Sequence, residues 1–376
     1  MDPLHANAAA VGAFPIRFLA EAMRNPVSAP EDHAGPDPDD AFQARLLDGV
    51  SRTFALTIPQ LPPTLARVVS NAYLLCRIMD TIEDEAALSP ATKRDFSARF
   101  VDAVAGLGSS DRFSGELAPL LSVQTLQAEH ELIRETPRVL SITHRFPAPQ
   151  RDALARCVRV MGEGMVSFQE QKRERGLADL ATLDRYCYHV AGVVGEMLTR
   201  LFCEHSPEIA LNREKLIPLA VSFGQGLQMT NILKDIWTDL SRGACWLPRD
   251  VFAKTGFDLN ELAPGRSDER FARGLETLVA IAHAHLKNAV RYAVLIPAEE
   301  VGIRNFCLWA IGMAVLTLRK ISRHPNFQSG DEVKISRRSV RATVVASRLA
   351  ASRDRTIRLL FHLAGRGLPS IAEGAG

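Results

Sequence analysis

Apolar residues recur at spacings of three and four along most of the chain between residues 60 and 361. This spacing puts apolar side chains on one face of an α-helix. Alternating β-branched runs bounded by turn pairs, which are typical of strands, are nearly absent. The pattern predicts helices over residues 60–85, 92–107, 116–140, 148–172, 182–204, 212–240, 268–295, 300–322 and 335–361. We therefore predict an all-α fold, formed by a single helical bundle domain.

The limits of this domain follow from composition. Residues 1–40 are rich in Pro, Ala and Asp and end in the run HAGPDPDD, which predicts a flexible N-terminal arm. Residues 41–362 show no shift in composition and no repeat of 20–50 residues, so we assign them to one domain. Residues 363–376 are predicted to be a flexible C-terminal tail.

Charge and cysteine content exclude several classes of protein. The 45 Lys and Arg residues nearly balance 43 Asp and Glu residues, so we expect no nucleic-acid partner. Six scattered cysteines form no CxxC pair and predict neither a zinc ribbon nor a disulfide framework. The N-terminus lacks the features of a secretory signal, and the uncharged stretch Asn305–Leu318 is shorter than the about 20 residues of a membrane span. We expect a cytoplasmic protein without a transmembrane anchor.

The first candidate motif combines acidic side chains with apolar neighbours. Tyr73, Arg77, Asp80 and Asp84 are spaced by four, three and four, so they share one stripe of a helix, and Glu83 lies beside it. Burial of several carboxylates without a partner is costly. A hard divalent cation such as Mg²⁺ would remove that cost, because it prefers oxygen ligands. The alternative is a solvated acidic helix end without a metal.

A second acidic stripe strengthens the metal interpretation. Asn231, Asp235 and Asp239 recur every four residues in an otherwise apolar segment. Two such helices can face each other in a bundle and hold metals between them. Two or more Mg²⁺ ions there would bind a diphosphate and help it to leave. The alternative is that the two helix faces are unrelated.

Basic residues near both stripes are candidate partners for phosphate groups. Arg77 and Lys234 lie within the acidic stripes, and Arg52 and Arg242 lie close to them in sequence. Residues 333–338 form a further basic cluster. The alternative for each of these residues, taken alone, is a solvated surface charge, and for the cluster it is a solvated loop.

A glycine-containing helix supplies a candidate tyrosine. Gly192 and Gly195 inside a helix each cost about 1 kcal/mol relative to Ala, which a close approach of helices or room for a ligand would compensate. Tyr186, just before them, is a candidate for proton transfer or for stabilising positive charge.

Taken together, these blocks resemble the squalene synthase branch of the head-to-head trans-isoprenyl synthases. The resemblance runs from about Ser51 to about Ser347. It rests, in order, on Ser51–Phe54, Tyr73–Asp84, Met161–Met165, Tyr186–Gly195, Leu227–Asp235, Asn305–Cys307 and Val333–Ile335. It implies an isoprenoid synthase fold around a central cavity.

The resemblance also implies an activity and its participants. Two molecules of farnesyl diphosphate would condense head to head with Mg²⁺ to give presqualene diphosphate, which NADPH would reduce to squalene. The implied metal ligands are Asp80, Glu83, Asp84, Asp235 and Asp239, and the implied catalytic residues are Tyr186, Asp80, Asp84, Asp235 and Asp239. We assign cofactor binding to Arg52, Arg77, Asn231, Lys234, Lys334 and Arg337, and substrate binding to Ser51, Phe54, Tyr73, Arg77, Gln228 and Arg242.

Some positions depart from the family pattern and keep alternatives open. Met229 stands where the family usually has Lys, Lys234 where it usually has Arg, and Ser336 replaces an Arg. The segment Arg242–Pro248 is closer to phytoene and dehydrosqualene synthases. The alternatives are a non-reducing relative that makes presqualene diphosphate, dehydrosqualene or phytoene, a terpene cyclase or prenyltransferase on the same fold, and a scaffold without activity. We expect a monomer that contacts membranes peripherally, since its substrate and product are apolar.

Overall fold

The computed structural model describes residues 37–51, 54–169, 175–263 and 268–370. In these residues the regular structure is helical, apart from one isolated parallel bridge between Leu177 and Pro248. The all-α prediction is confirmed. The longer helices are α2 (Pro38–Val50), α4 (Pro63–Asp84), α5 (Pro90–Val104), α8 (Thr136–Arg145), α9 (Ala148–Gln169), α11 (Val193–His205), α13 (Arg213–Ser241), α15 (Glu269–Leu295), α16 (Val301–Arg323), α18 (Arg337–Ala350) and α19 (Asp354–Ala364).

Short elements connect these helices. The short α-helices are α3 (Phe54–Thr57), α6 (Ser110–Leu117), α7 (Gln127–Arg134), α10 (Leu180–Cys187), α12 (Pro207–Ala210), α14 (Arg249–Ala253) and α17 (Gly330–Val333). The 3-10 turns are η1 (Ile58–Gln60), η2 (Ala118–Leu120) and η5 (Leu259–Glu261). A π-helical turn, η4 (Tyr188–Gly192), joins α10 to α11, so the predicted helix over 182–204 is continuous but locally widened.

Two of the predicted helices are broken, and in each a buried charge binds the chain at one break. The predicted helix 116–140 is interrupted between η2 and α7, where the Glu85 carboxylate accepts hydrogen bonds from Ser122 N (2.8 Å) and Thr125 Oγ1 (2.6 Å). The predicted helix 335–361 divides into α18 and α19. At that break the buried guanidinium of Arg304 donates to Ala351 O and to Asp354 Oδ1, both at 2.8 Å. The apolar period did not reveal these breaks, because the partners come from distant segments.

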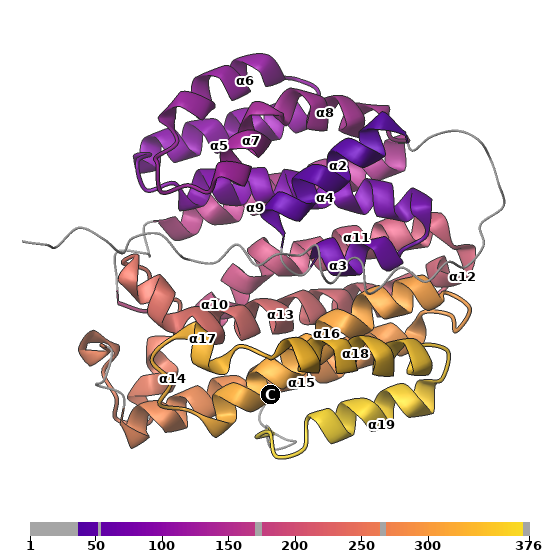
Figure 1. Ribbon diagram of the computed structural model, residues 1–376. Helices are drawn as coiled ribbons and strands as arrows, with labels where there is room; N and C mark the ends of the chain where they lie inside the picture. The colour runs from indigo at the N-terminus through magenta and orange to yellow at the C-terminus, as the bar shows by residue number, and fades with distance from the viewer. Residues whose placement is uncertain (1–36, 52–53, 170–174, 264–267, 371–376) are drawn as a thin grey trace, which may run out of the picture.

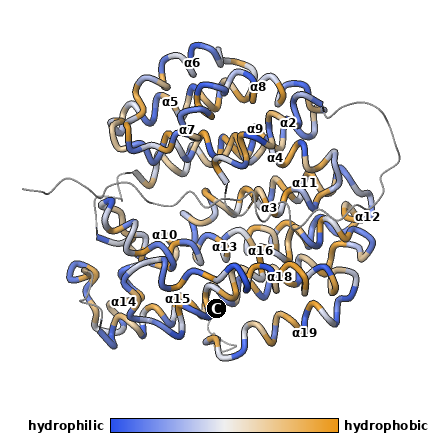
Figure 2. Tube along the Cα trace, in the orientation of Figure 1, coloured by the Kyte–Doolittle hydropathy of each residue, from blue (hydrophilic) through white to orange (hydrophobic). Residues whose placement is uncertain are grey.

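Chain order maps onto position in the bundle. In Figure 1 the helices α5 to α8 lie together at one end, and α15, α18 and α19 lie at the other, with α11 and α13 between them. The buried apolar residues form two clusters, one centred on α4, α5, α8 and α9 and the other on α13, α14 and α15. Helix α16 contributes to both clusters, and Figure 2 shows apolar residues recurring along the central helices.

Helix α11 and the π-turn cross α13 at backbone contact. A Cβ atom added at Gly195 would overlap the carbonyl oxygen of Ala220, and one added at Gly224 would overlap the carbonyl oxygen of Ala191. The close helix approach predicted at Gly195 is therefore confirmed. The two pairs also show that the helices run antiparallel, because the residue number rises in one as it falls in the other.

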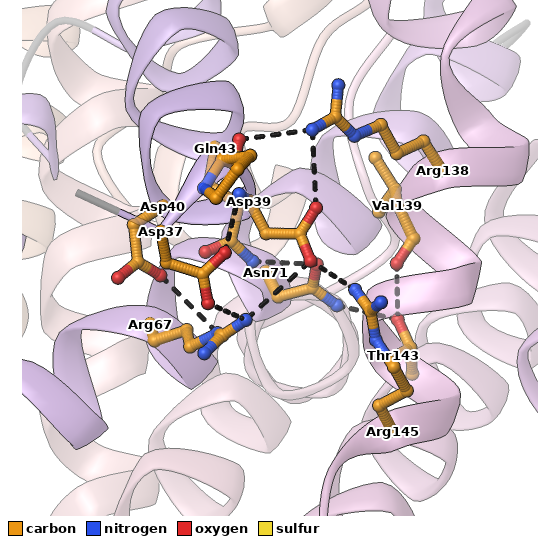
Figure 3. Close-up of polar contacts among 11 residues, drawn as sticks. Asp37, Asp39, Asp40, Gln43, Arg67, Asn71, Arg138, Val139, Thr143 and Arg145 are labelled. Carbon is orange, nitrogen blue, oxygen red and sulfur yellow. Dashed lines mark hydrogen bonds and ion pairs between the residues drawn. The ribbon is translucent and has the colours of Figure 1, made fainter. Parts of the chain in front are cut away.

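The N-terminal boundary of the domain lies earlier than the sequence predicted. Helix α2 begins at Pro38, inside the range assigned to the flexible arm, and Asp37 caps it by accepting from Asp39 N at 2.9 Å. Figure 3 shows Asp39 between the guanidinium groups of Arg138 and Arg145. These ion pairs fix residues 37–40 to the bundle, whereas residues 1–36 lie outside the described residues.

The C-terminal boundary lies later than the predicted residue 362. Helix α19 ends at Ala364, and the ring nitrogen Nδ1 of His283 lies 3.2 Å from Pro369 O. The chain is thus held against α15 at least as far as residue 369. Residues 371–376 lie outside the described residues.

One helix among the described residues is long and apolar enough to cross a membrane by length and composition. It is α16, and 72% of its apolar window is buried inside the bundle. Such burial is typical of a core helix.

We predict that neither glycine contact in this helix crossing tolerates a side chain. Gly224→Ala should lower the free energy of unfolding by about 3 kcal/mol, because backbone atoms must move to admit the methyl group. Gly115→Ala is the matched control, since Gly115 is an exposed position of helix α6 where an added Cβ would have open space around it. It should instead raise stability by about 0.5–1 kcal/mol. Denaturant unfolding measures both, and equal effects would contradict the close crossing.

Candidate functional site

The open face of α4 coincides with the first acidic stripe. From Val68 to Asp84, the side chains that are not buried are Tyr73, Cys76, Arg77, Asp80 and Asp84. The residues between them, including Leu74, Leu75, Ile78 and Met79, are fully buried. The helix therefore turns one polar stripe to an open space and packs its other faces. Glu83, beside the stripe, is 6% exposed.

An ion pair from another helix holds the basic member of this stripe. Glu129 of α7, whose side chain is 10% exposed, bonds to Arg77 Nη2, and its other oxygen accepts from Leu126 N at 3.3 Å. Arg77 Nη1 also lies 3.8 Å from Asp80 Oδ2. Glu129 thus holds the guanidinium of Arg77 in place beside the stripe, and the other end of that guanidinium remains close enough to attract the Asp80 carboxylate.

The carboxylates of the first stripe repel one another. Burial raises the pKa of Asp80 to about 7, against the charge of Arg77 and together with the charges of Asp84 and Glu83. A nearby cation relieves such repulsion by neutralising the carboxylates. The arrangement therefore suits a divalent cation.

The second acidic stripe is likewise the open face of its helix. Asn231 is exposed although α13 packs against α11, α15 and α16. Gln228, Lys234, Asp235 and Asp239 are partly exposed along the same side. Met229, Ile232, Leu233 and Ile236 are buried between them. The central helix of the bundle thus keeps one polar side open, which supports the central cavity that the resemblance implies.

The basic segment 333–338 is anchored beside the second stripe. Trp237 Nε1 donates to Phe327 O at 2.6 Å, and the N-terminal residue of α17, Gly330, packs against the carboxylate of Asp235. Val333 is fully buried, whereas the Lys334 side chain is 44% exposed and lies 3.4 Å from Asp331. Within the second stripe, Lys234 Nζ lies 3.1 Å from Asp235 Oδ2.

Tyr186 lies within electrostatic range of both stripes. Burial raises the pKa of its hydroxyl well above the ordinary value, and the negative charges of Glu83, Asp84 and Asp239 raise it further. Glu83 and Asp84 belong to α4 and Asp239 belongs to α13, so both acidic motifs act on one hydroxyl. This common neighbour indicates that the two stripes face the same space.

Aromatic rings surround this tyrosine. The ring of Tyr186 stacks on Trp246 with centroids 4.0 Å apart and planes 11° apart. Phe168 meets it edge to face at 5.4 Å. Tyr186 and Trp246 are 6% and 7% exposed, so the wall is almost dry.

The oxygen donors fit Mg²⁺ as an ion shared with a ligand. Among the described residues, no three acidic, His or Cys side chains stand close enough to hold a metal by themselves. Mg²⁺ usually binds one or two carboxylates, waters and substrate phosphates. Two separated carboxylate stripes suit that mode, in which a diphosphate completes the coordination.

The remaining predicted residues have varied settings. Arg52 lies outside the described residues. Ser51 is buried and caps α3, because its Oγ accepts from Phe54 N at 2.9 Å and from Ala55 N at 3.3 Å. Phe54 stacks obliquely on Tyr73, with ring centroids 5.2 Å apart. Arg242 is exposed at the C-terminus of α13, and Arg337 is exposed in the first turn of α18.

Sequence reasoning missed two residues of this site. Glu129 lies in a short amphipathic helix, and no pattern there linked it to Arg77. Trp246 belongs to the segment compared with other family branches, but nothing in its spacing indicated a stack with Tyr186. Both depend on contacts over 52 and 60 positions of sequence, respectively.

Comparisons with known proteins agree on one family. The sequence profile described as "Squalene/phytoene synthase" matches residues 47–339. The squalene synthase of Cyberlindnera jadinii is 28% identical over 312 residues, which are 81% of this chain and 66% of that protein. The squalene synthase BSS of Botryococcus braunii is 29% identical over 75% of this chain and 58% of its own length. The matched part of the chain thus spans less than two thirds of the length of each of these relatives.

Solved structures share the fold. The structure of TcSQS with the ligand BPH1237 has a TM-score of 0.73 at 23% identity, covering 90% of this chain and 94% of that one. A dehydrosqualene synthase in complex with a ligand has a TM-score of 0.62 at 20% identity, covering 83% of this chain and 95% of that one. The expected isoprenoid synthase fold is confirmed.

We predict that the pair formed by Glu129 and Arg77 matters more to stability than a matched exposed pair. Glu129→Gln removes the buried partner of a half-buried guanidinium and should lower the free energy of unfolding by about 2 kcal/mol. Glu131→Gln, on the same helix, breaks the exposed pair with Arg45 and should cost less than about 0.5 kcal/mol. Denaturant unfolding of the two variants compares them. Equal losses would show that Glu129 does not hold Arg77 as described.

Proposed function

The chain belongs to the squalene/phytoene synthase family, and we propose that it is a squalene synthase, a Mg²⁺-dependent farnesyl-diphosphate farnesyltransferase. The observation that carries the proposal is that Tyr186 is buried and within electrostatic range of the carboxylates of both stripes. Two farnesyl diphosphates would give presqualene diphosphate, one diphosphate and a proton. Presqualene diphosphate and NADPH would then give squalene, a second diphosphate and NADP⁺.

The charged side chains of the two stripes would bind the diphosphate groups of the substrate. Asp80, Glu83, Asp84, Asp235 and Asp239 are the candidates to hold Mg²⁺. When bound, Mg²⁺ would neutralise the charge that develops on the departing diphosphate. Arg77, oriented by Glu129, and Lys234, beside Asp235, are placed to bind diphosphate oxygens.

The aromatic wall protects the apolar end of the substrate. Loss of diphosphate leaves an allylic cation, which water would quench, so the surroundings must be dry. Tyr186, Trp246 and Phe168 pack on one another and would border this region, and aromatic rings stabilise a nearby cation without reacting with it. The Tyr186 hydroxyl keeps its proton at neutral pH, which suits an orienting or proton-relaying role better than that of a free base.

The reductive step rests on the basic segment that follows α17. NADPH would supply the hydride. Lys334 and Arg337, with Arg52, Arg77, Asn231 and Lys234, are the candidates to hold its phosphates. Met229 is 1% exposed and contributes to the core, so this position adds no charge for a cofactor. That observation favours a second candidate function, a relative that releases presqualene diphosphate or dehydrosqualene without reduction.

Product analysis tests the proposal. Purified protein incubated with farnesyl diphosphate, Mg²⁺ and NADPH should yield squalene, and omission of NADPH should abolish squalene. Asp80→Asn and Asp235→Asn should each lower turnover by at least about 1,000-fold because each removes a metal-binding charge. Asp95→Asn, an exposed change on α5, is the control and should retain activity. Release of presqualene diphosphate or dehydrosqualene alone, with NADPH present, would support the non-reducing function instead.

Tyr186→Phe tests the role of the hydroxyl. We expect presqualene diphosphate formation to fall by about 100-fold, the usual scale for a positioned proton-transfer group. Tyr188→Phe is the matched control, since Tyr188 Oη bonds instead to Glu196 at 3.2 Å. Quantification of presqualene diphosphate in single-turnover reactions measures the effect. Near-normal formation with Tyr186→Phe would indicate that the released diphosphate accepts the proton.

The expected localisation, oligomeric state and partners form part of this proposal. We propose a cytoplasmic monomer whose substrate is farnesyl diphosphate, with no nucleic-acid partner. The apolar substrate and product support contact with a membrane surface.

A further inference from the structure

The positive charge of the chain is concentrated in its last two helices. Residues 334–370 contain nine Lys and Arg residues and one acidic residue, Asp354. The rest of the chain therefore contains 36 basic and 42 acidic residues. The nearly balanced total hides a basic segment attached to an acidic body. We call residues 334–370, which comprise α18, α19, the turn between them and the flanking residues, the basic hairpin.

The same hairpin exposes apolar side chains. Val345 and Leu349, one turn apart on α18, are 57% and 71% exposed. Leu359 and Leu363, one turn apart on α19, are 56% and 50% exposed. These are four of the ten large apolar side chains that are exposed in the described part of the chain. Both helices therefore show apolar residues to solvent in addition to the face that they bury.

The buried contacts of the hairpin fix which side faces outward. Ala350, Ala351 and Ile357 are buried, and Arg304 binds the turn from below through Ala351 O and Asp354. Helix α18 packs on α16, and α19 packs on α15 and α16. In Figure 1 both helices lie at the outer edge of the bundle, at the end opposite to α5–α8. The hairpin is thus held rigidly with one side free of other helices.

The arginines of this outer side are available for a partner. In the described part of the chain, no ion pair involves Arg338, Arg341, Arg353, Arg355, Arg358 or Arg366. The one acidic residue of the hairpin, Asp354, is already bonded to the buried Arg304. The positive charge therefore remains without compensation within the hairpin. In Figure 2 polar and apolar residues alternate along both helices.

We propose that the basic hairpin docks the protein on an anionic phospholipid bilayer. Helices that lie in a membrane interface combine basic residues with exposed apolar ones, and each Lys or Arg near anionic lipid contributes to binding. A nucleic acid would use the arginines but would leave Val345, Leu349, Leu359 and Leu363 in water. A second copy of the chain would bring arginines against arginines. The bilayer is the occupant that satisfies both kinds of side chain.

Vesicle sedimentation tests this docking without any assay of activity, so it does not depend on the proposed function. The protein should bind vesicles of phosphatidylglycerol and phosphatidylcholine, and binding should weaken when NaCl rises from about 0.1 to 0.5 M. Arg355→Gln with Arg358→Gln should weaken binding roughly 30-fold, the equivalent of about 1 kcal/mol for each charge. Leu349→Ser with Leu359→Ser should weaken it at least roughly tenfold.

Matched variants outside the hairpin distinguish docking by this surface from a general effect of lost positive charge or lost apolar surface. Arg134→Gln with Arg213→Gln, and Leu107→Ser with Leu211→Ser, remove exposed side chains of the same types outside the hairpin and should leave binding unchanged. All four double variants should keep the thermal unfolding midpoint, because every substituted side chain is exposed.

Several results would overturn the proposal. They are absence of binding to anionic vesicles, equal binding by both hairpin variants and the wild type, and tighter binding to double-stranded DNA than to vesicles. A concentration-dependent dimer that Leu349→Ser with Leu359→Ser dissolves would also overturn it, because the apolar side chains would then cover a second copy.

Discussion

The site depends on the backbone crossing between α11 with its π-turn and the central helix α13. At Gly195 and Gly224 a carbonyl oxygen of the opposite helix occupies space that a Cβ atom would need, so the two helices can approach this closely only because both residues are glycine. Continued along the antiparallel helices, this register brings Tyr186 to the level of the second acidic stripe. The hydrogen bond from Gln225 Nε2 to Asp184 O, at 3.3 Å, marks the same level. A bulkier residue at either glycine would push the two helices apart. It would thereby move Tyr186 away from α13 and disturb its stack on Trp246.

Electrostatic asymmetry within each helix then defines where chemistry can occur. Helix α4 buries Leu74, Ile78 and Met79 completely while its carboxylates remain on the open stripe. Burial, together with the charges of Asp84 and Glu83, raises the pKa of Asp80. Arg77 and Lys234 are the basic residues within the two stripes. The folded chain is therefore prepared for cations and anions to arrive together. In the function that we propose, a diphosphate with Mg²⁺ would meet that demand.

A second segregation of charge operates on the outside of the molecule. The body is acidic overall, whereas the hairpin of α18 and α19 is strongly basic and exposes apolar side chains. The buried Arg304 connects these regions, since its guanidinium joins Ile296 O to Ala351 O across α16. An apolar substrate and product would reach such an enzyme from a membrane, and a fixed docking side would hold the body at a constant orientation to the bilayer.

The sequence alone determined most of the helices and the two acidic stripes, and it indicated one side of the small-residue crossing at Gly195. Each acidic stripe and most helices are encoded in spacings of three or four residues, which the α-helix converts directly into one face. The sequence also placed the family, because blocks such as Tyr73–Asp84 and Leu227–Asp235 are local. Only the tertiary structure decided which distant groups meet. The partnership of Glu129 with Arg77, the stack of Trp246 on Tyr186, and the breaks set by Glu85 and Arg304 all join segments that no short spacing relates. Their physical reason is that a buried charge or ring must find a partner in three dimensions, and chain distance places no limit on where that partner comes from.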